Sequence, residues 1–173
     1  MPLQLVSQMA DPYNFEALRR LVLSRNESVD VGIGNNLKTS MSSSSQWDAN
    51  WTAAHCFISG GTNAWIAKDL NTSQFIQVEV AQDKVFTKVT TQGRMGVYQQ
   101  WVEKYQIIYS RDGAQWFEAR EVNSGLTLFQ GNSDQCTKAT NTLVPFIAKY
   151  VRLIPLKWHE HISMRMEMQV LDD

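Results

Sequence analysis

Apolar and polar residues alternate along four stretches of the chain, at residues 76–80, 85–89, 105–109 and 162–170. In each stretch every second residue is apolar or, at Thr87, β-branched. Successive side chains of a β-strand point to opposite faces, so this spacing predicts four strands that each bury one face.

The stretch at 162–170 has the clearest pattern. Its apolar face holds Ile162, Met164, Met166, Met168 and Val170. A helix could not place all five on one side. The opposite face carries Ser163, Arg165, Glu167 and Gln169. Because Arg165 and Glu167 share that face, we expect them to form an ion pair that fixes the strand register, with no acid–base role.

Long polar loops join these stretches, and no helical crossover separates them. Parallel strands need such crossovers, whereas antiparallel strands do not. The pattern therefore predicts an all-β domain, an antiparallel sandwich or jelly roll.

The first residues follow a different, helical pattern. Asp11 is a favourable N-cap, and Pro12 suits the first helical position. Apolar residues then recur at helical spacing, at Phe15, Leu18 and Val22. We expect a helix over about 12–24 within an N-terminal extension, 1–28, and a β domain over 29–173. We interpret the helix as an appendage packed on the domain; a partner-binding or oligomerisation helix is the alternative.

Composition narrows the function. The chain has 173 residues, 43% of them hydrophobic, with a net charge of -1. It is long enough to bury a core without disulfides, and it lacks the basic excess of nucleic-acid-binding domains. No apolar run of about eighteen residues predicts a membrane span. The sequence as written starts without a basic, then apolar, signal peptide.

Few residues offer catalytic or metal-binding chemistry. The three histidines lie in no known catalytic motif, and His55 adjoins Cys56 in a geometry unsuited to a catalytic pair. His159 and His161 could share a strand face and hold a metal, but no third ligand is evident, so we favour a surface loop. Cys56 and Cys136 either form one bridge or are both buried thiols. We expect no enzyme activity.

Four segments carry a family resemblance. They are Val89-Thr-Thr-Gln-Gly-Arg94, residues 101–116 with Ser110-Arg-Asp-Gly113 and Trp116, Phe129-Gln-Gly-Asn-Ser-Asp134, and residues 150–167. In this order and spacing they resemble the discoidin domain family, also called the coagulation factor V/VIII C-type domain. The likeness runs from about Leu37 to Leu171.

The resemblance implies a jelly roll of roughly eight main strands. It also implies a non-catalytic module that binds glycans or phospholipid head groups through loops at one end. It favours an extracellular or cell-surface location. Many members tie their ends with a disulfide, which this chain lacks. Some relatives hold a calcium with loop carbonyls, so a structural calcium is allowed; no other cofactor is expected.

By resemblance, four tryptophans match scaffold positions and are expected in the core: Trp65, Trp101, Trp116 and Trp158. Trp47 and Trp51 differ, because they lie in a polar stretch that aligns with the family's first protruding loop. We expect Trp51 to fold inward and Trp47 to offer a flat face for stacking.

The next loop, 93–100, keeps the Arg94 of galactose-binding members. The acidic residue that follows in those members is replaced by Met95, Gly96 and Val97. Asp48 is the candidate to supply a carboxylate instead. A third loop, 131–138, adds Asp134 and Lys138. The charges of the three loops sum to zero, so there is no net electrostatic attraction toward an anionic membrane.

These residues define one predicted site, made of Trp47, Asp48, Asn50, Arg94, Met95 and Tyr98. We expect Trp47 to stack on a sugar, Asp48 and Arg94 to bind hydroxyls, Tyr98 to wall the site and Asn50 to assist. The hypothesis is a lectin-like or adhesion module. Docking on membrane lipid head groups through Trp47, Met95 and Tyr98 is the first alternative, and a protein-interaction module the second. Because each site is expected to bind its sugar weakly, function would need several linked sites, and a homo-oligomer is one expected way to supply them.

Overall fold

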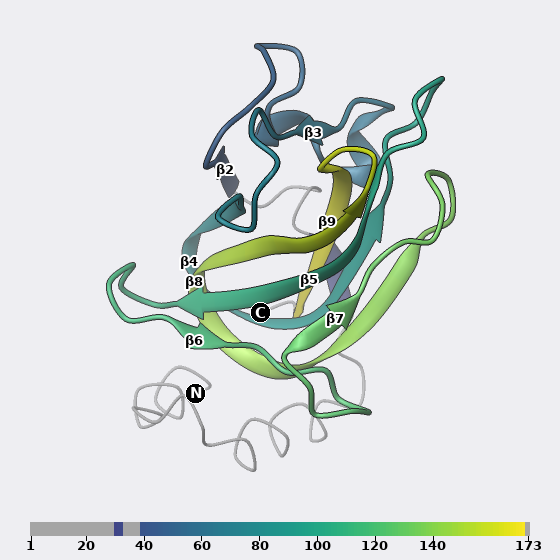
Figure 1. The fold of residues 1–173 in the computed structure, drawn as a ribbon. Helices are drawn as coiled ribbons and strands as arrows, with labels where there is room; N and C mark the ends of the chain where they lie inside the picture. The colour runs from purple at the N-terminus through teal and green to yellow at the C-terminus, as the bar shows by residue number, and fades with distance from the viewer. Residues whose placement is uncertain (1–29, 33–38, 172–173) are drawn as a thin grey trace, which may run out of the picture.

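The computed structural model describes residues 30–32 and 39–171, and strands form most of that part (Figure 1). The strands are β1 (Asp30–Gly32), β2 (Thr39–Ser43), β3 (Trp65–Ile66), β4 (Ile76–Gln92), β5 (Trp101–Ser110), β6 (Phe117–Glu118), β7 (Leu128–Gln130), β8 (Ala139–His159) and β9 (Ser163–Leu171). Two short 3₁₀ helices are η1 (Ala53–His55) and η2 (Ile58–Gly60).

The strands pair antiparallel in the order β1-β9-β4-β8-β5-β6. Three further strands join at the sides: β2 pairs with β4, β3 with β9 and β7 with β5. The expected all-β antiparallel architecture is confirmed.

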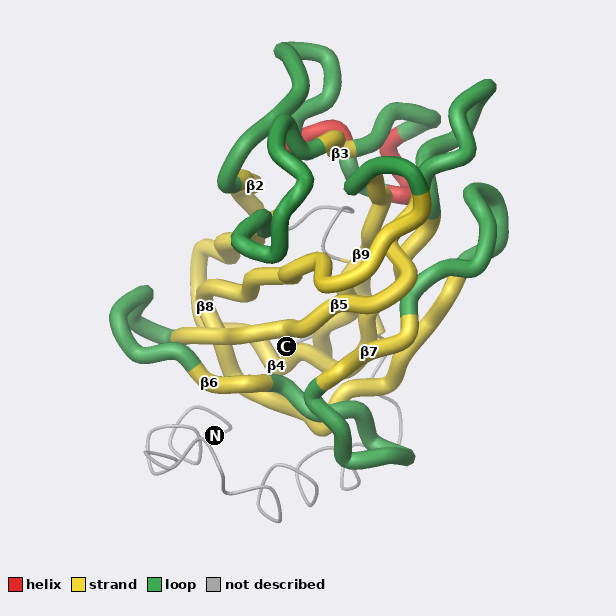
Figure 2. Tube along the Cα trace, in the orientation of Figure 1, coloured by secondary structure: helices red, strands yellow, loops and turns green. Residues whose placement is uncertain are grey.

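The long strands β4 and β8 each run through two parts of the sheet and pair with different strands along their length. The first part of β4 pairs with β2 and the second half of β8, and its later part pairs with β9 and the first half of β8. The pairing of β4 with β8 shifts register between Glu79 and Lys84. Figure 2 shows the sheet curling over on itself, so that its inner face encloses the core.

Aromatic rings fill the centre of this core. Phe146 stacks on Phe86 with ring centroids 5.5 Å apart and on Tyr109 at 4.1 Å. Tyr105 stacks on Phe129 at 5.5 Å. Burying each such side chain contributes about 1.5–3 kcal/mol. The sandwich is therefore held by its interior, and its end loops are left for other roles.

The period-two predictions hold for three of the four stretches. The inward residues of 76–80, 105–109 and 162–170 are all buried. The alternation expected over 85–89 holds at Thr87 and Val89, which are buried, but is wrong at Val85, because the register shift between Phe86 and Lys88 inserts a bulge. Phe86 is fully buried there, whereas Val85 is partly exposed.

The predicted ion pair between Arg165 and Glu167 is also wrong. Arg165 is only 5% exposed, and its guanidinium donates hydrogen bonds to Gln92 and to the carbonyls of Ile58 and Gly61. Its end of β9 is buried on both faces, since η2 and the residues after it cover the face that the sequence pattern assigned to solvent.

The predicted helix at 12–24 and the extension over 1–28 lie outside the described residues. Within the part of the chain that the structure describes, no helix combines the length and the apolar character needed to cross a bilayer.

Candidate functional site

Several loops meet at one end of the sandwich, which we call the loop end (Figure 2). They are residues 44–64, 93–100 and 131–138, with the β8–β9 turn at 160–162. The strand register brings them together, because Thr91 of β4 pairs with Ala139 of β8 and Trp101 of β5 pairs with His159. Residues far apart in the sequence thus share one surface.

Arg94 is held at the centre of the loop end by two aromatic rings. Its Cζ atom lies 4.3 Å from the ring centroid of Trp51 and 4.3 Å from that of Tyr98. Such cation–π contacts contribute about 0.5–1 kcal/mol at exposed sites and more when desolvated. Partial burial lowers the pKa of the Arg94 guanidinium from its usual value, although arginine remains charged at neutral pH.

A glutamine fixes the arginine from the side. Arg94 Nη1 donates to Gln100 Oε1 at 3.1 Å, and the Arg94 backbone N–H donates to the Gln100 carbonyl at 3.0 Å. Gln100 Oε1 also accepts from the buried Ser163 hydroxyl at 3.0 Å. The first residue of β9 therefore anchors the 93–100 loop.

Trp47 projects from the neighbouring loop and is 58% exposed. Its backbone N–H donates to the Ile66 carbonyl at 2.8 Å, which fixes the loop on β3. Its ring meets the His161 ring edge-on, with centroids 5.6 Å apart and an interplanar angle of 83°. The expected exposure of Trp47 is confirmed. Trp51 is partly buried against Arg94 at the loop end.

Asp48 and Asn50 are both exposed on the same loop. Asp48 Oδ1 accepts a hydrogen bond from the Asn50 backbone N–H at 2.7 Å, and so it caps its own turn. Among the described residues, no ion pair joins Asp48 to Arg94, whose contacts are with Trp51, Tyr98 and Gln100. Asp48 and Arg94 therefore make separate contacts at the loop end, and the expectation that both bind sugar hydroxyls stays a prediction.

The apolar residues of the 93–100 loop differ in exposure. Val97 is 89% exposed and Tyr98 53%, whereas Met95 is partly buried. Gly96 between them has φ +117°, a conformation that favours glycine. The loop therefore raises Val97 and Tyr98 into solvent beside Arg94.

The 131–138 loop packs closely behind this tip. Gln135 Nε2 donates to the Gly96 carbonyl at 3.0 Å. A Cβ atom on Gly93 would lie only 2.6 Å from the Gln135 Cα, so a side chain there would force the two loops apart. Asp134 accepts from the backbone N–H groups of Thr137 and Cys136 at 2.6 and 2.7 Å, which holds its pKa below the usual range.

Comparison with known proteins now bears on this geometry. The profile of the F5/8 type C domain matches residues 40–168, which is most of the chain. The chain belongs to the F5/8 type C, or discoidin, family. Mouse retinoschisin is 36% identical over 126 residues, which cover 70% of this chain and 56% of retinoschisin. The chain spans about half the length of the retinoschisins it matches.

Two solved structures share the fold. Discoidin II of Dictyostelium discoideum superposes with a TM-score of 0.74 and 26% identity, covering 84% of this chain and 60% of that one. The CBM32-5 domain of Clostridium perfringens, solved in complex with GalNAc-β-1,3-galactose, superposes with a TM-score of 0.61 and 20% identity. It covers 83% of this chain and is itself matched over its whole length.

In this discoidin domain the buried side chain of Arg165 donates hydrogen bonds to backbone carbonyls, a kind of oxygen that can also bind calcium. The backbone oxygens of Ile58 and Gly61 accept from Arg165 Nη2, and Gln92 Oε1 accepts from Nη1 at 2.9 Å. Calcium prefers oxygen ligands of this kind. Because a guanidinium already satisfies these oxygens, they do not fit a calcium ion.

The cysteines and the paired histidines take structural positions. Of the two alternatives left open for the cysteines, neither is found: Cys56 and Cys136 are free thiols, and Cys136 is exposed whereas Cys56 is buried. His159 stacks on Trp101 at 4.1 Å, while His161 contacts Trp47. The two imidazole rings thus contact different tryptophans.

The scaffold tryptophans are less uniform than expected. Trp65 is fully buried, and Trp158 is partly buried and packs against the core. Trp101 and Trp116 are also partly exposed. Trp116 lies under the guanidinium of Arg152, whose Cζ is 4.1 Å from its ring centroid.

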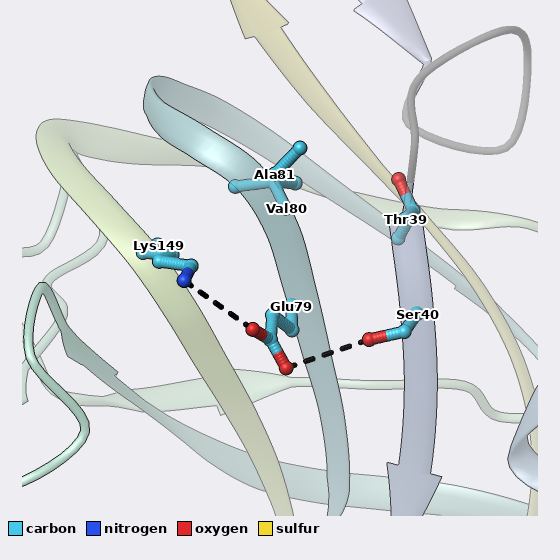
Figure 3. A pocket seen from close by; sticks show the side chains of 6 residues that line it. All are labelled: Thr39, Ser40, Glu79, Val80, Ala81 and Lys149. Carbon is cyan, nitrogen blue, oxygen red and sulfur yellow. Dashed lines mark hydrogen bonds and ion pairs between the residues drawn. The ribbon is translucent and has the colours of Figure 1, made fainter.

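A shallow pocket of about 320 Å³ lies elsewhere, beside β2, β4 and β8 (Figure 3). Its lining includes Ser40, Glu79 and Lys149, and the charges of the last two are 3.5 Å apart. Tyr150 and then Glu79 raise the pKa of Lys149. Because the two charges neutralise each other, this pocket offers less to a ligand than the loop end does.

Sequence reasoning found the arginine and tryptophans of the loop end but missed their supports. Gln100 and Ser163 carry no distinctive motif, and 63 positions separate them. The alternation of β9 indicates only that Ser163 lies opposite the methionine face; the partner it meets depends on how β4, β5 and β9 converge.

Proposed function

We propose that this discoidin domain is a non-catalytic recognition module that binds terminal sugars of glycoconjugates at its loop end, in an extracellular or cell-surface setting. The observation that carries the proposal is Trp47, a residue that is 58% exposed at the end of the molecule where Arg94 is also held. A ring of this size is costly to leave in water unless something covers it.

The residue types of the loop end suit a sugar. An indole face covers the apolar side of a pyranose ring, and fixed N–H donors bind its hydroxyls. Trp47 supplies the first, and Arg94 and Asn50 supply the second. The CBM32-5 domain shares the fold and was solved with a disaccharide, which supports this ligand class.

A site this open buries little of its ligand, so each copy is expected to bind weakly. Useful avidity then requires several linked sites, which multiply affinity through effective concentration. We therefore propose that the protein works as an oligomer or on multivalent surfaces.

A glycan array with two matched variants tests the proposal. Trp47→Ala is expected to lose glycan binding, because it removes the stacking face. Leu126→Ala is the control, since Leu126 is as exposed as Trp47, at 59%, but lies on the β6–β7 connection. Equal array signals from both variants would remove Trp47 from the site, and blank arrays for the unaltered protein would refute glycan binding.

A second candidate function rests on Val97, which is 89% exposed beside Tyr98. An apolar tip of this kind can insert between lipid head groups. Vesicle sedimentation with phosphatidylserine or phosphatidylcholine separates the two functions. Lipid docking predicts that Val97→Asp releases the protein from vesicles, whereas Leu126→Asp does not; an unaltered sugar response in Val97→Asp would then mark two separable activities.

A further inference from the structure

Arg94 is a partly buried cation for which the described residues supply no anionic partner. Its protein contacts are two aromatic rings and the neutral side chain of Gln100. A guanidinium has five N–H donors, and among the described residues one of them, on Nη1, meets a protein acceptor. The described residues supply no acceptor for the other four donors, and the Arg94 side chain is only partly buried.

The nearby carboxylates are engaged by backbone groups. Asp48 Oδ1 accepts from the Asn50 N–H at 2.7 Å, and Asp134 Oδ1 accepts from two N–H groups at 2.6 and 2.7 Å. Each closes a turn within its own loop. Neither forms an ion pair with Arg94, so the positive charge of Arg94 is not neutralised from within the described protein.

The setting of Arg94 fixes its direction as well as its charge. Trp51 and Tyr98 hold the guanidinium in place, and the Ser163–Gln100 pair holds one edge. A rigid guanidinium with open N–H groups matches the planar, two-oxygen geometry of a carboxylate, which it binds through paired hydrogen bonds.

Resting on the proposed function, we propose that the sugar bound at the loop end carries a carboxylate, as uronic and sialic acids do, and that this carboxylate is bound by Arg94. The exposed indole of Trp47 favours a sugar acid over a bare oxyanion, because a free phosphate or sulfate has no apolar face to lie on an aromatic ring. Binding of the sugar carboxylate by Arg94 makes the site selective for charge, and stacking of the sugar ring on Trp47 adds a second point of contact.

Acid and ester forms of the same sugar test this selectivity. The probes are methyl β-glucuronide and its methyl ester, and the methyl glycoside of N-acetylneuraminic acid and its methyl ester, titrated by NMR into the full chain. Esterification removes the charge and leaves the ring unchanged. We expect at least one acid to bind about tenfold more tightly than its ester. A hydrogen bond to a charged group contributes more binding free energy than one to a neutral group, and the difference corresponds to about that ratio of dissociation constants.

Variants assign the preference to Arg94. Arg94→Gln is expected to bind acid and ester equally, and Arg94→Lys to recover only part of the preference, since lysine lacks the planar pair of donors. Arg111→Gln is the matched control, because Arg111 follows the opposite end of β5 and pairs with Asp83. The preference should also weaken with added salt.

The outcomes separate this inference from the proposed function. If neutral glycosides bind on the array and no acid binds better than its ester, the inference is refuted and the proposed function stands. If inorganic phosphate or phosphatidylserine vesicles bind in a way that depends on Arg94 while both sugar acids fail to bind, the ligand is a phosphate and the sugar assignment is wrong. If no glycan binds at all, both are refuted.

Discussion

At the scale of single residues, the loop end depends on side-chain contacts that the sequence does not indicate. Arg94 lies against Trp51 and Tyr98 and bonds to Gln100. The residue types were predictable from a polar loop with aromatic residues. Their pairing was not, because it depends on how separate loops meet.

Ser163 is predicted to be a positioning residue for Arg94. Ser163→Ala removes the hydroxyl that donates to Gln100 Oε1 at 3.0 Å, so Arg94 should lose part of its fixed orientation. We expect a several-fold smaller preference for sugar acids over their esters, measured by the same NMR titrations. Ser163→Thr keeps a hydroxyl and should restore it; a loss of stability with an unchanged acid-to-ester ratio would contradict the role.

Arg165 is predicted to be needed for stability. Arg165→Met leaves Gln92 and the carbonyls of Ile58 and Gly61 without their donor. Each buried polar group left unpaired costs about 1–3 kcal/mol, so urea unfolding should show a loss of at least that size. Arg120→Met, at an exposed position, is the control and should change the unfolding free energy little. Equal losses in the two variants would refute the assignment.

At the scale of elements, the strands follow from their pattern, but their irregularities do not. Period-two alternation found the paired segments of β4, β5 and β9, since burial of one face dictates it. The bulge between Phe86 and Lys88 arises where β4 meets β8 and β9 at once, and a single strand's sequence does not record that junction. The same limit explains why the burial of Arg165 was missed.

The contact between two loops gives an element-scale prediction. Gly93→Ala would place a Cβ atom 2.6 Å from the Gln135 Cα, so the 131–138 loop must move. We expect faster amide hydrogen exchange in 131–138 and weaker ligand binding. Gly32→Ala is the control, since its nearest atom, at 3.3 Å, belongs to the side chain of Glu167. Unchanged exchange in Gly93→Ala would show that the loops tolerate separation.

Calcium removal tests the role given to the η2 segment. Because Arg165 satisfies the carbonyls of Ile58 and Gly61, the segment does not depend on a metal ion there. Thermal unfolding with calcium and with a chelator should give the same midpoint. A midpoint that rises with calcium would contradict this account of the segment.

At the scale of the whole molecule, stability comes from the core without a disulfide. The two free thiols differ in setting, as Cys56 is buried and Cys136 is exposed. Burial raises the pKa of the Cys56 thiol far above its usual range, so it has little reactive thiolate. A thiol reagent should label one cysteine, Cys136, in the native protein and both after unfolding. Labelling of Cys56 in the native state would contradict the fold.

Three carboxylates make the stability of the molecule depend on pH. Backbone N–H groups lower the pKa of Asp112, Glu121 and Asp134 below their usual values. A depressed pKa adds stability above the ordinary values of about 3.9 for Asp and 4.3 for Glu, and this stability is lost as the pH falls through the folded-state pKa. The midpoint of thermal unfolding should therefore decrease as the pH is lowered below about 4. Asp112→Asn should show a shallower decline, and an identical decline would refute its contribution.

The account depends most on recognition at the loop end, and the six tryptophans allow it to be tested directly. The indole N–H signals can be followed by ¹H–¹⁵N NMR while the glycan that binds best on the array is added. Binding at the loop end predicts that the signals of Trp47 and Trp51 shift first and furthest, while that of Trp116, in the β5–β6 connection, stays in place. Shifts confined to Trp116, with Trp47 unmoved at saturation, would contradict it.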